Sequence, residues 1–184
     1  SNVNLTLDTI TSTGGTIVMS DNTSSLWQKF NLTFEGNNTV TADNYNYKGK
    51  IETPSYFPID DSTNTSTTQL YVDNGVKVAD NASLTMNAND SVDYNIMEKG
   101  NKYDHSFIVG EGAKVTMTGT NVGNVIQDQY VSSGAWNNIV NFGDRANVTM
   151  TAPTVNVLMN NGHTGLYKYP HDSTFTINRS ATVN

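Results

Sequence analysis

The stretch GEGAKVTMT, Gly110–Thr118, recurs almost unchanged as GDRANVTMT, Gly143–Thr151. A third copy, ADNASLTMN, occupies Ala79–Asn87, and a looser one, HDSTFTIN, occupies His171–Asn178. The first two copies lie 33 positions apart, and the third lies 31 positions before them. Repetition at intervals of this size is typical of proteins built from stacked structural repeats.

Aligning the copies produces four columns of alternating character. The columns are small residues at Ala82, Ala113, Ala146 and Ser173; apolar residues at Leu84, Val115, Val148 and Phe175; threonines at Thr85, Thr116, Thr149 and Thr176; and apolar residues at Met86, Met117, Met150 and Ile177. Successive side chains of a β-strand point to opposite faces. We therefore predict that the small and apolar columns face inward and that the threonine column faces solvent.

Each unit contains further apolar segments. GVKV, SFIV, NIVNF and GLYKY precede the four copies, and VGNVI and PTVNVLM follow the two closest ones. Three short strands per unit of about 30 residues, without helical periodicity, predict the coils of a parallel β-solenoid. An antiparallel sandwich is the alternative, but hairpin signals are poor and a sandwich has no reason to repeat a nine-residue phrase in register.

The first third of the chain fits the repeat less well. We assign Val40 and Leu5 to the first apolar column, so that the successive intervals in that column are 35, 44, 31, 33 and 27. The long interval predicts a loop insertion at about 43–67, which holds two of the four prolines, residues that resist placement in a central strand. Gln127–Trp136 is a second, shorter excursion. The chain is thus predicted to be one domain, 1–184, with about five or six coils.

Composition agrees with a β protein. Asn and Thr contribute 26 and 25 of the 184 residues, and charged residues only 15%; threonine favours strands and asparagine favours turns. The net charge is −7 and the ten Lys and Arg are scattered, which argues against a nucleic-acid partner at neutral pH. Near the pI of about 4.7 this repulsion vanishes. The absence of cysteine excludes disulfides, thiol catalysis and cysteine-type zinc sites.

Residues that could carry catalysis do not converge in the sequence. The acidic residues Asp80, Glu111 and Asp144 fall at corners, where we expect them to form turns. The pairs Asp60–Asp61 and Asp90–Asp93 lack a third ligand at a recognised spacing, so no metal site is predicted. The three histidines, His105, His163 and His171, are predicted to be loop residues, and none has a metal-binding spacing. We therefore predict no catalytic residue, no cofactor and no enzyme activity.

Aromatic residues gather in the two excursions. These residues are Tyr45, Tyr47, Tyr56 and Phe57 in the insertion and Tyr130 and Trp136 in the second excursion. Aromatic faces stack on sugar rings, and Tyr-rich loops make adaptable polar contacts, so these six residues are the candidate ligand-binding residues. The structural alternative is that the rings hold the loops against the solenoid wall.

The coil GDRANVTMTAPTVNVLMNNG, residues 143–162, is rich in Asn and Thr and free of Cys. It resembles the pectate-lyase-like solenoids of Gram-positive cell-surface adhesins, in particular the epithelial and serine-rich repeat adhesins of lactobacilli. The resemblance covers about Gln69–Asn184. It implies a right-handed parallel β-solenoid at the outer end of a wall-anchored protein that attaches to host epithelium, mucus glycans or other polysaccharides. No family binding motif is present from which a functional residue could be carried over.

The sequence thus predicts a non-catalytic adhesin domain, extracellular and attached to the cell wall, that binds host or environmental glycans or glycoproteins. Neither end of the chain carries a targeting, membrane or sorting signal, which favours a domain excised from a longer protein. Two alternatives remain open at this point. One is a structural or self-assembling surface-layer or stalk module, and the other is a polysaccharide lyase or hydrolase.

Overall fold

The computed structural model describes residues 2–13, 17–19, 29–41, 68–88, 92–98, 103–128, 137–160 and 172–184. These residues form seventeen β-strands and no helix. Sheet A consists, in order, of β1 (Asn2–Asp8), β4 (Lys29–Glu35), β7 (Gly75–Val78), β10 (His105–Val109), β13 (Asn138–Phe142) and β16 (Ser173–Ile177). Sheet B consists of β2 (Thr11–Thr13), β5 (Asn37–Thr41), β8 (Ser83–Asn87), β11 (Lys114–Thr118), β14 (Asn147–Thr151) and β17 (Thr182–Val183). Sheet C consists of β3 (Ile17–Met19), β6 (Thr68–Val72), β9 (Tyr94–Glu98), β12 (Gly123–Asp128) and β15 (Val155–Asn160).

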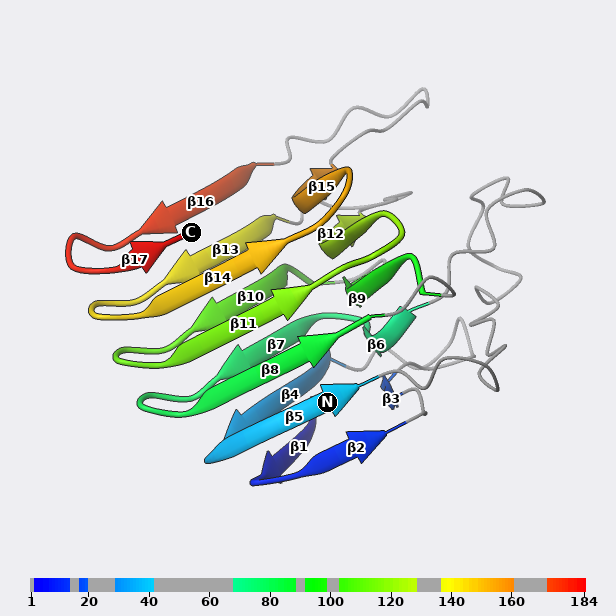
Figure 1. Ribbon diagram of the computed structural model, residues 1–184, viewed down its shortest axis with the longest axis horizontal. Coiled ribbons are helices and arrows are strands. Elements are labelled where there is room, and N and C mark those ends of the chain that lie inside the picture. The colour runs from blue at the N-terminus through cyan, green and yellow to red at the C-terminus, as the bar shows by residue number, and fades with distance from the viewer. Residues whose placement is uncertain are drawn as a thin grey trace.

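The chain visits the three sheets in a constant cycle from A to B to C, and every strand pair recorded between neighbouring coils is parallel. Figure 1 shows the result as a stack of coils, with β1 and β2 at one end and β16 and β17 at the other. The protein is therefore an all-β parallel β-solenoid, as the repeat predicts. Stacking satisfies the backbone groups of each coil through the coils above and below it.

The repeated phrase pairs with itself in register. In sheet B, Val115 lies between Leu84 and Val148, and Met117 lies between Met86 and Met150. All six of these side chains are buried, whereas the threonines between them, Thr85, Thr116 and Thr149, are half-buried on the outer face. The predicted inward and outward directions of these columns are confirmed.

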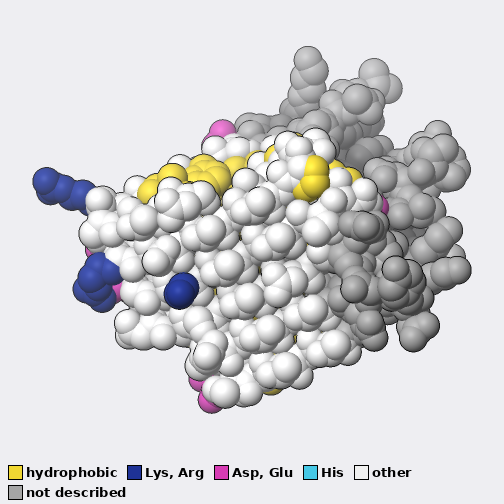
Figure 2. Space-filling model, viewed as in Figure 1, with side chains coloured by type: hydrophobic (Ala, Val, Ile, Leu, Met, Phe, Trp, Pro, Cys, Tyr) yellow, Lys and Arg dark blue, Asp and Glu magenta, His cyan; other side chains and the backbone are white. Residues whose placement is uncertain are grey.

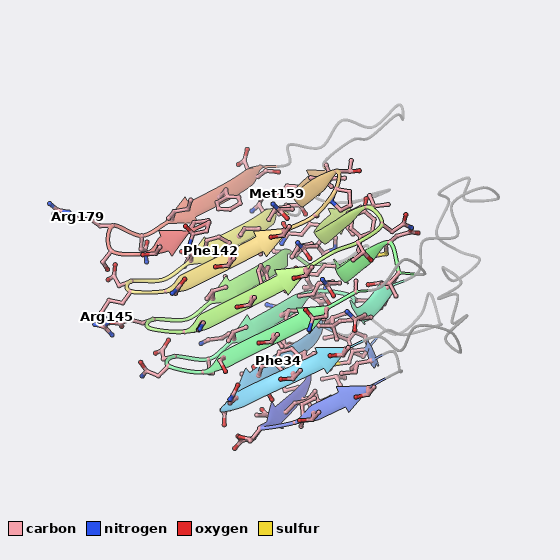
Figure 3. The ribbon with its side chains drawn as sticks, in the orientation of Figure 1. Phe34, Phe142, Arg145, Met159 and Arg179 are labelled. Atoms are coloured by element: carbon pink, nitrogen blue, oxygen red, sulfur yellow. The ribbon has the colours of Figure 1, made fainter. Side chains whose placement is uncertain are left out.

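The core is one continuous apolar interior that runs the length of the stack. Phe34, Phe107 and Phe142 are fully buried on the inner face of sheet A, and Figure 3 labels Phe34 and Phe142. The ring of Phe142 packs edge-on against Phe107 with a centroid distance of 6.4 Å and against Phe175 at 5.3 Å. Edge-to-face ring pairs of this kind add to the hydrophobic stabilisation of the stack.

The prediction that HDSTFTIN is the fourth copy of the sheet B strand is wrong by one strand. Phe175 and Ile177 belong to sheet A, where they pair with Val140 and Phe142, and Val183 is the residue that pairs with Val148. The alternation of apolar and polar residues is the same in sheets A and B, so the sequence HDSTFTIN is compatible with a strand of either sheet. The deciding signal is the corner, because Asn178–Ala181 forms a tight turn with an Ala181 N–H···O=C Asn178 bond of 3.0 Å. The true fourth small residue is Ala181 and not Ser173.

Two N-terminal assignments are also corrected. Leu5 lies in sheet A and pairs with Leu32, and Val40 pairs with Met86 in the second apolar column. Asn38 takes the first column, because its side chain satisfies backbone groups of three coils. The interval in this column between Asn38 and Leu84 is thus 46 positions, and the insertion at 43–67 falls within it. That insertion remains a prediction, since residues 42–67 lie outside the described part of the chain, as does GLYKY.

Three of the corners between sheets A and B, at residues 79–82, 110–113 and 143–146, are four-residue turns whose third residue has a left-handed backbone. Asn81, Gly112 and Arg145 occupy this position with φ of 59°, 67° and 58°. Glycine adopts this conformation without a steric cost, and other residues do so at a cost of about 1–2 kcal/mol. A Cβ at Gly112 would also lie 2.5 Å from Asn81 Oδ1.

Gly112→Ala should therefore lower the free energy of unfolding by about 1 kcal/mol. The measurement is chemical denaturation followed by circular dichroism, with Asp144→Ala, an exposed change in the corner of the next coil, as the control. The control should stay within about 0.5 kcal/mol of the parent protein. Equal stabilities of Gly112→Ala and the parent would show that the corner tolerates a side chain.

Candidate functional site

The six aromatic candidates predicted from the sequence lie outside the described residues. They are Tyr45, Tyr47, Tyr56, Phe57, Tyr130 and Trp136. The flanking strands are described: β5 ends at Thr41 and β6 begins at Thr68, while β12 ends at Asp128 and β13 begins at Asn138. In Figure 1 these strand ends lie on the side of sheet C, opposite the tight corners that join sheets A and B. The described strand ends that flank the two excursions therefore lie on the same side of the solenoid.

A row of amide side chains, which we call the asparagine ladder, runs along sheet C. Gln69, Asn95, Asn124 and Asn156 occupy equivalent positions in β6, β9, β12 and β15. Asn95 Nδ2 donates to Asn124 Oδ1 at 2.6 Å, and Asn124 Nδ2 donates to Asn156 Oδ1 at 2.9 Å. Gln69 Nε2 donates to Asn95 Oδ1. The ladder joins four coils by side-chain hydrogen bonds in addition to their backbone bonds.

The ladder also holds the turns that lead from sheet B into sheet C. Asn95 Nδ2 donates to the carbonyl of Thr118 at 3.1 Å, and Asn124 Nδ2 donates to the carbonyl of Thr151 at 3.1 Å. Both carbonyls belong to the last residue of a sheet B strand. Each asparagine thus fixes the path between two sheets as well as the spacing between two coils. Sequence reasoning missed these residues, although the recurrence YNIM, GNVI and VNVL at 94–97, 123–126 and 155–158 carries the signal.

A buried carboxylate lies where sheet C turns into sheet A. Glu98, the last residue of β9, is fully buried. In the register of sheet C it lies beside Gln127 of β12, which lies beside Met159 of β15. Glu98 Oε2 accepts the backbone N–H of Ser106 at 3.1 Å, and Glu98 Oε1 accepts Gln127 Nε2 at 3.2 Å. Gln127 Nε2 also donates to the carbonyl of Ile139 at 2.8 Å. Glu98 and Gln127 thereby tie sheet C to two strands of sheet A.

Burial raises the pKa of the Glu98 carboxyl well above its ordinary value of 4.5. The hydrogen bonds from Gln127 and from the Ser106 backbone act in the opposite direction, but they are the smaller influence. Removing a carboxylate from water disfavours its charged form more strongly than two hydrogen bonds favour it. The protonated form of Glu98 is therefore favoured in the folded protein relative to the unfolded chain.

His105 is not a loop residue, contrary to the prediction. It is the first residue of β10, it is fully buried, and its Nδ1 lies 3.1 Å from Asn138 Oδ1 of the next coil. The alternation of burial along β10 explains this position, because His105 shares the inner face with Phe107 and Val109. His163 and His171 lie outside the described residues.

Acidic and amide side chains connect successive corners. Asp80 lies in a corner turn, as predicted, but its Oδ1 accepts the backbone N–H of Glu111 in the next coil at 2.9 Å and not an amide of its own turn. Asp104 Oδ1 accepts the N–H of Asn137 at 2.7 Å in the same manner at the entry to sheet A. At the corner tips, Arg145 forms an ion pair of 2.9 Å with Glu111 (Figure 3). Both side chains are at least half exposed, so this pair contributes little to stability.

Sheet B presents the most regular outer surface of the described residues. Thr11, Thr39, Thr85, Thr116 and Thr149 form one outward column, and Thr13, Thr41, Asn87, Thr118 and Thr151 form the next. Within the six strands of this sheet, Lys114 is the single charged residue and no residue is aromatic. Figure 2 views this face, which is largely uncharged and polar. We refer to these two columns as the threonine face.

Among the described residues no three His, Asp or Glu side chains converge to hold a metal ion. Asp93 lies in the turn before β9 and accepts a hydrogen bond from Asn121 Nδ2, while Asp60, Asp61 and Asp90 lie outside the described residues. No helix long and apolar enough to cross a membrane occurs in the described ranges.

The solenoid is similar to one solved bacterial structure, an SRRP of L. reuteri 100-23. The comparison has a TM-score of 0.52 and 17% sequence identity, and it covers 98% of this chain and 70% of that one. The likeness is one of fold. No protein-family model and no curated protein matches the sequence. The SRRP therefore supports the stacked-coil architecture over nearly the whole chain and transfers no binding residue to it.

Proposed function

We propose that this chain is a non-catalytic adhesin module of an extracellular, cell-wall-attached protein, which binds glycans or glycoproteins of host epithelium or mucus. The observation that carries the proposal is the likeness of fold to the L. reuteri SRRP across 98% of the chain. The coil phrasing, which resembles lactobacillus adhesins, supports it independently. Binding residues are usually displayed on loops that a rigid scaffold positions, and the stacked coils are a scaffold of this kind.

The first test is binding of the purified chain to a glycan array, to mucin and to epithelial cells, at neutral pH and near the pI of about 4.7. We expect saturable binding to a glycan or glycoprotein in at least one condition. The net charge of −7 opposes acidic ligands at neutral pH, so binding to these should strengthen as the pH falls. Silence on all three ligand sources at both pH values would refute the adhesin proposal.

The insertion is tested by replacing Tyr45, Tyr47, Tyr56 and Phe57 together with alanine. Binding should be lost while the circular dichroism spectrum and melting temperature are retained, because a loop that supplies aromatic contacts does not hold the core together. The matched control changes the three tyrosines to phenylalanine and should retain most of the binding. A second set, Tyr130→Ala with Trp136→Ala, separates the two excursions. Retained binding in both alanine sets would exclude these loops as the site.

A self-assembling or stalk module is the second candidate, and the ends of the stack favour it. Phe175, Ile177 and Val183 at one end are 44%, 51% and 43% exposed, although their columns are buried inside the solenoid. Leu5 at the other end is 39% exposed and belongs to the same column as Leu32. Concentration-dependent growth of the particle mass in light scattering, abolished by Ile177→Lys, would favour this function. A monomer at all concentrations would exclude it.

A further inference from the structure

The outer face of sheet B is more regular than the fold requires. Sheet A is built from the same coils with the same register, yet its outer positions vary freely, for example from Gly75 to Ser106 to Ile139. Stacking therefore does not demand a uniform outer column. In sheet B, by contrast, the central outer column is threonine in all five coils from Thr11 to Thr149. Several residue types suit an exposed strand position, so propensity alone does not select threonine every time.

The side chains of the threonine face form a two-dimensional array with one spacing along the stacking axis and another along the strands. Neighbouring coils are separated by about 4.8 Å, and the two threonine columns are about 7 Å apart along each strand. Nine of the ten positions in the two columns are threonines, and the tenth is Asn87. Each threonine offers one hydroxyl, which can donate and accept a hydrogen bond, and one methyl group. A ligand can contact equivalent threonines of many coils at once only if its own chemical groups repeat along the stacking axis.

The charge and side-chain composition of this face restrict the ligand further. Lys114 is the one cation among its strands, and the adjoining corners carry the acids Asp80, Glu111 and Asp144 together with Arg145 and Arg179. The face and its corners therefore have no excess of positive charge that would favour an anionic polymer. No aromatic ring is present on the strands of sheet B for stacking against a single sugar. Hydroxyl and methyl groups without charge fit an uncharged ligand that carries hydroxyl groups along its length.

We propose that the threonine face binds an extended neutral polysaccharide that lies along the stacking axis of the solenoid. One residue of such a chain is similar in length to the separation of two coils, so successive sugars meet equivalent threonine pairs. Each contact is weak, because a protein–sugar hydrogen bond replaces hydrogen bonds to water. Affinity arises from the number of contacts along the polymer. This inference rests on the proposed adhesin function and assigns it a ligand class and a second surface, separate from the aromatic loops.

The test is affinity electrophoresis of the chain in gels that contain hydroxyethyl cellulose or galactomannan, with polygalacturonate as the charged comparison. The decisive variant is Thr116→Val with Thr149→Val, which removes two central hydroxyls and keeps the shape and strand propensity of both side chains. We expect retardation by the neutral polymers and about tenfold weaker apparent affinity in this variant, since each lost hydrogen bond costs about 1 kcal/mol or less. The matched control, Thr33→Val with Thr176→Val, makes the same change on the outer face of sheet A and should bind as the parent does.

The outcomes separate the two proposals. If the neutral polymers retard the parent and the sheet B variant equally, the threonine face is not the site, and the adhesin function stands on its loops. If the parent binds mucin or polygalacturonate but neither neutral polymer, the ligand class is wrong and the adhesin function again stands. If the parent binds no polymer, mucin or cell, both proposals fail. Unchanged melting temperatures of the two valine variants exclude misfolding as the cause of any loss.

Discussion

Asn124→Ala should lower the free energy of unfolding by about 3 kcal/mol, because it removes the centre of a buried hydrogen-bond ladder. Asn124 is fully buried, accepts from Asn95 and donates to Asn156 and to the carbonyl of Thr151. Alanine leaves the amide of Asn95 and the Thr151 carbonyl without these partners. Leaving buried polar groups unsatisfied costs about 1–3 kcal/mol each, which is more than the net gain from forming the bonds.

Equilibrium denaturation in urea measures this loss, and Asn147→Ala is the matched control. Asn147 is an exposed asparagine of sheet B one coil away, so its replacement should change the stability by no more than about 0.5 kcal/mol. A loss below about 1 kcal/mol for Asn124→Ala would mean that the ladder does not hold the turns between sheets B and C. The loss should also appear as faster amide exchange at Thr151 and its neighbours.

Glu98→Gln should stabilise the protein at neutral and alkaline pH and remove the contribution of Glu98 to the pH dependence of its unfolding. The pKa of Glu98 is raised in the folded state above its ordinary value of 4.5. The stability that this residue contributes is therefore fully present below pH 4.5 and is lost as the pH rises through the folded-state pKa. At pH 8 the folded protein must either keep a proton on Glu98 or bury a charge, and both are unfavourable relative to the unfolded chain.

The measurement is the melting temperature of the parent and of Glu98→Gln between pH 4 and pH 9. Above the raised pKa, the glutamine variant should melt at the higher temperature, and the difference should shrink toward acidic pH. Glu35→Gln, an exposed carboxyl of sheet A, serves as the control and should follow the pH profile of the parent. A profile for Glu98→Gln that runs parallel to that of the parent would show that Glu98 contributes nothing to the pH dependence.

Several features of the fold follow directly from local sequence patterns. The nine-residue phrase predicted the coil period, the inward columns at Val115 and Met117 and the outward column at Thr116, and the observed register confirms each of them. This success has a simple cause, because strand alternation and stacking make every coil a copy of its neighbour. Val40 lies in the predicted sheet but pairs with Met86 in its second apolar column, because alternation fixes the face of a strand and not its register. The errors at Leu5 and Phe175 share a different cause. Two sheets use the same alternation, so a strand without a recognised corner can be assigned to the wrong one.

The chemistry of the interior could not be predicted in the same way. Glu98 and His105 look like solvent-exposed residues in the sequence, and only the neighbouring coil supplies the partners Gln127 and Asn138 that accompany their burial. The loop candidates follow from composition alone, and their predicted role is to be tested by the alanine sets. The uniform threonine face was visible as a column in the sequence, but its significance depends on comparison with the variable outer face of sheet A.

By itself, the sequence determined the period of the solenoid and which side of each repeated strand is buried, because these properties depend on side chains two positions apart. The tertiary structure decided which sheet each strand joins and which polar residues become buried. These outcomes depend on contacts between residues about 30 positions apart, such as the bonds from Asn95 to Asn124 and from Gln127 to Glu98. A hydrogen bond between coils forms only when both coils are stacked, so local patterns cannot reveal its partner.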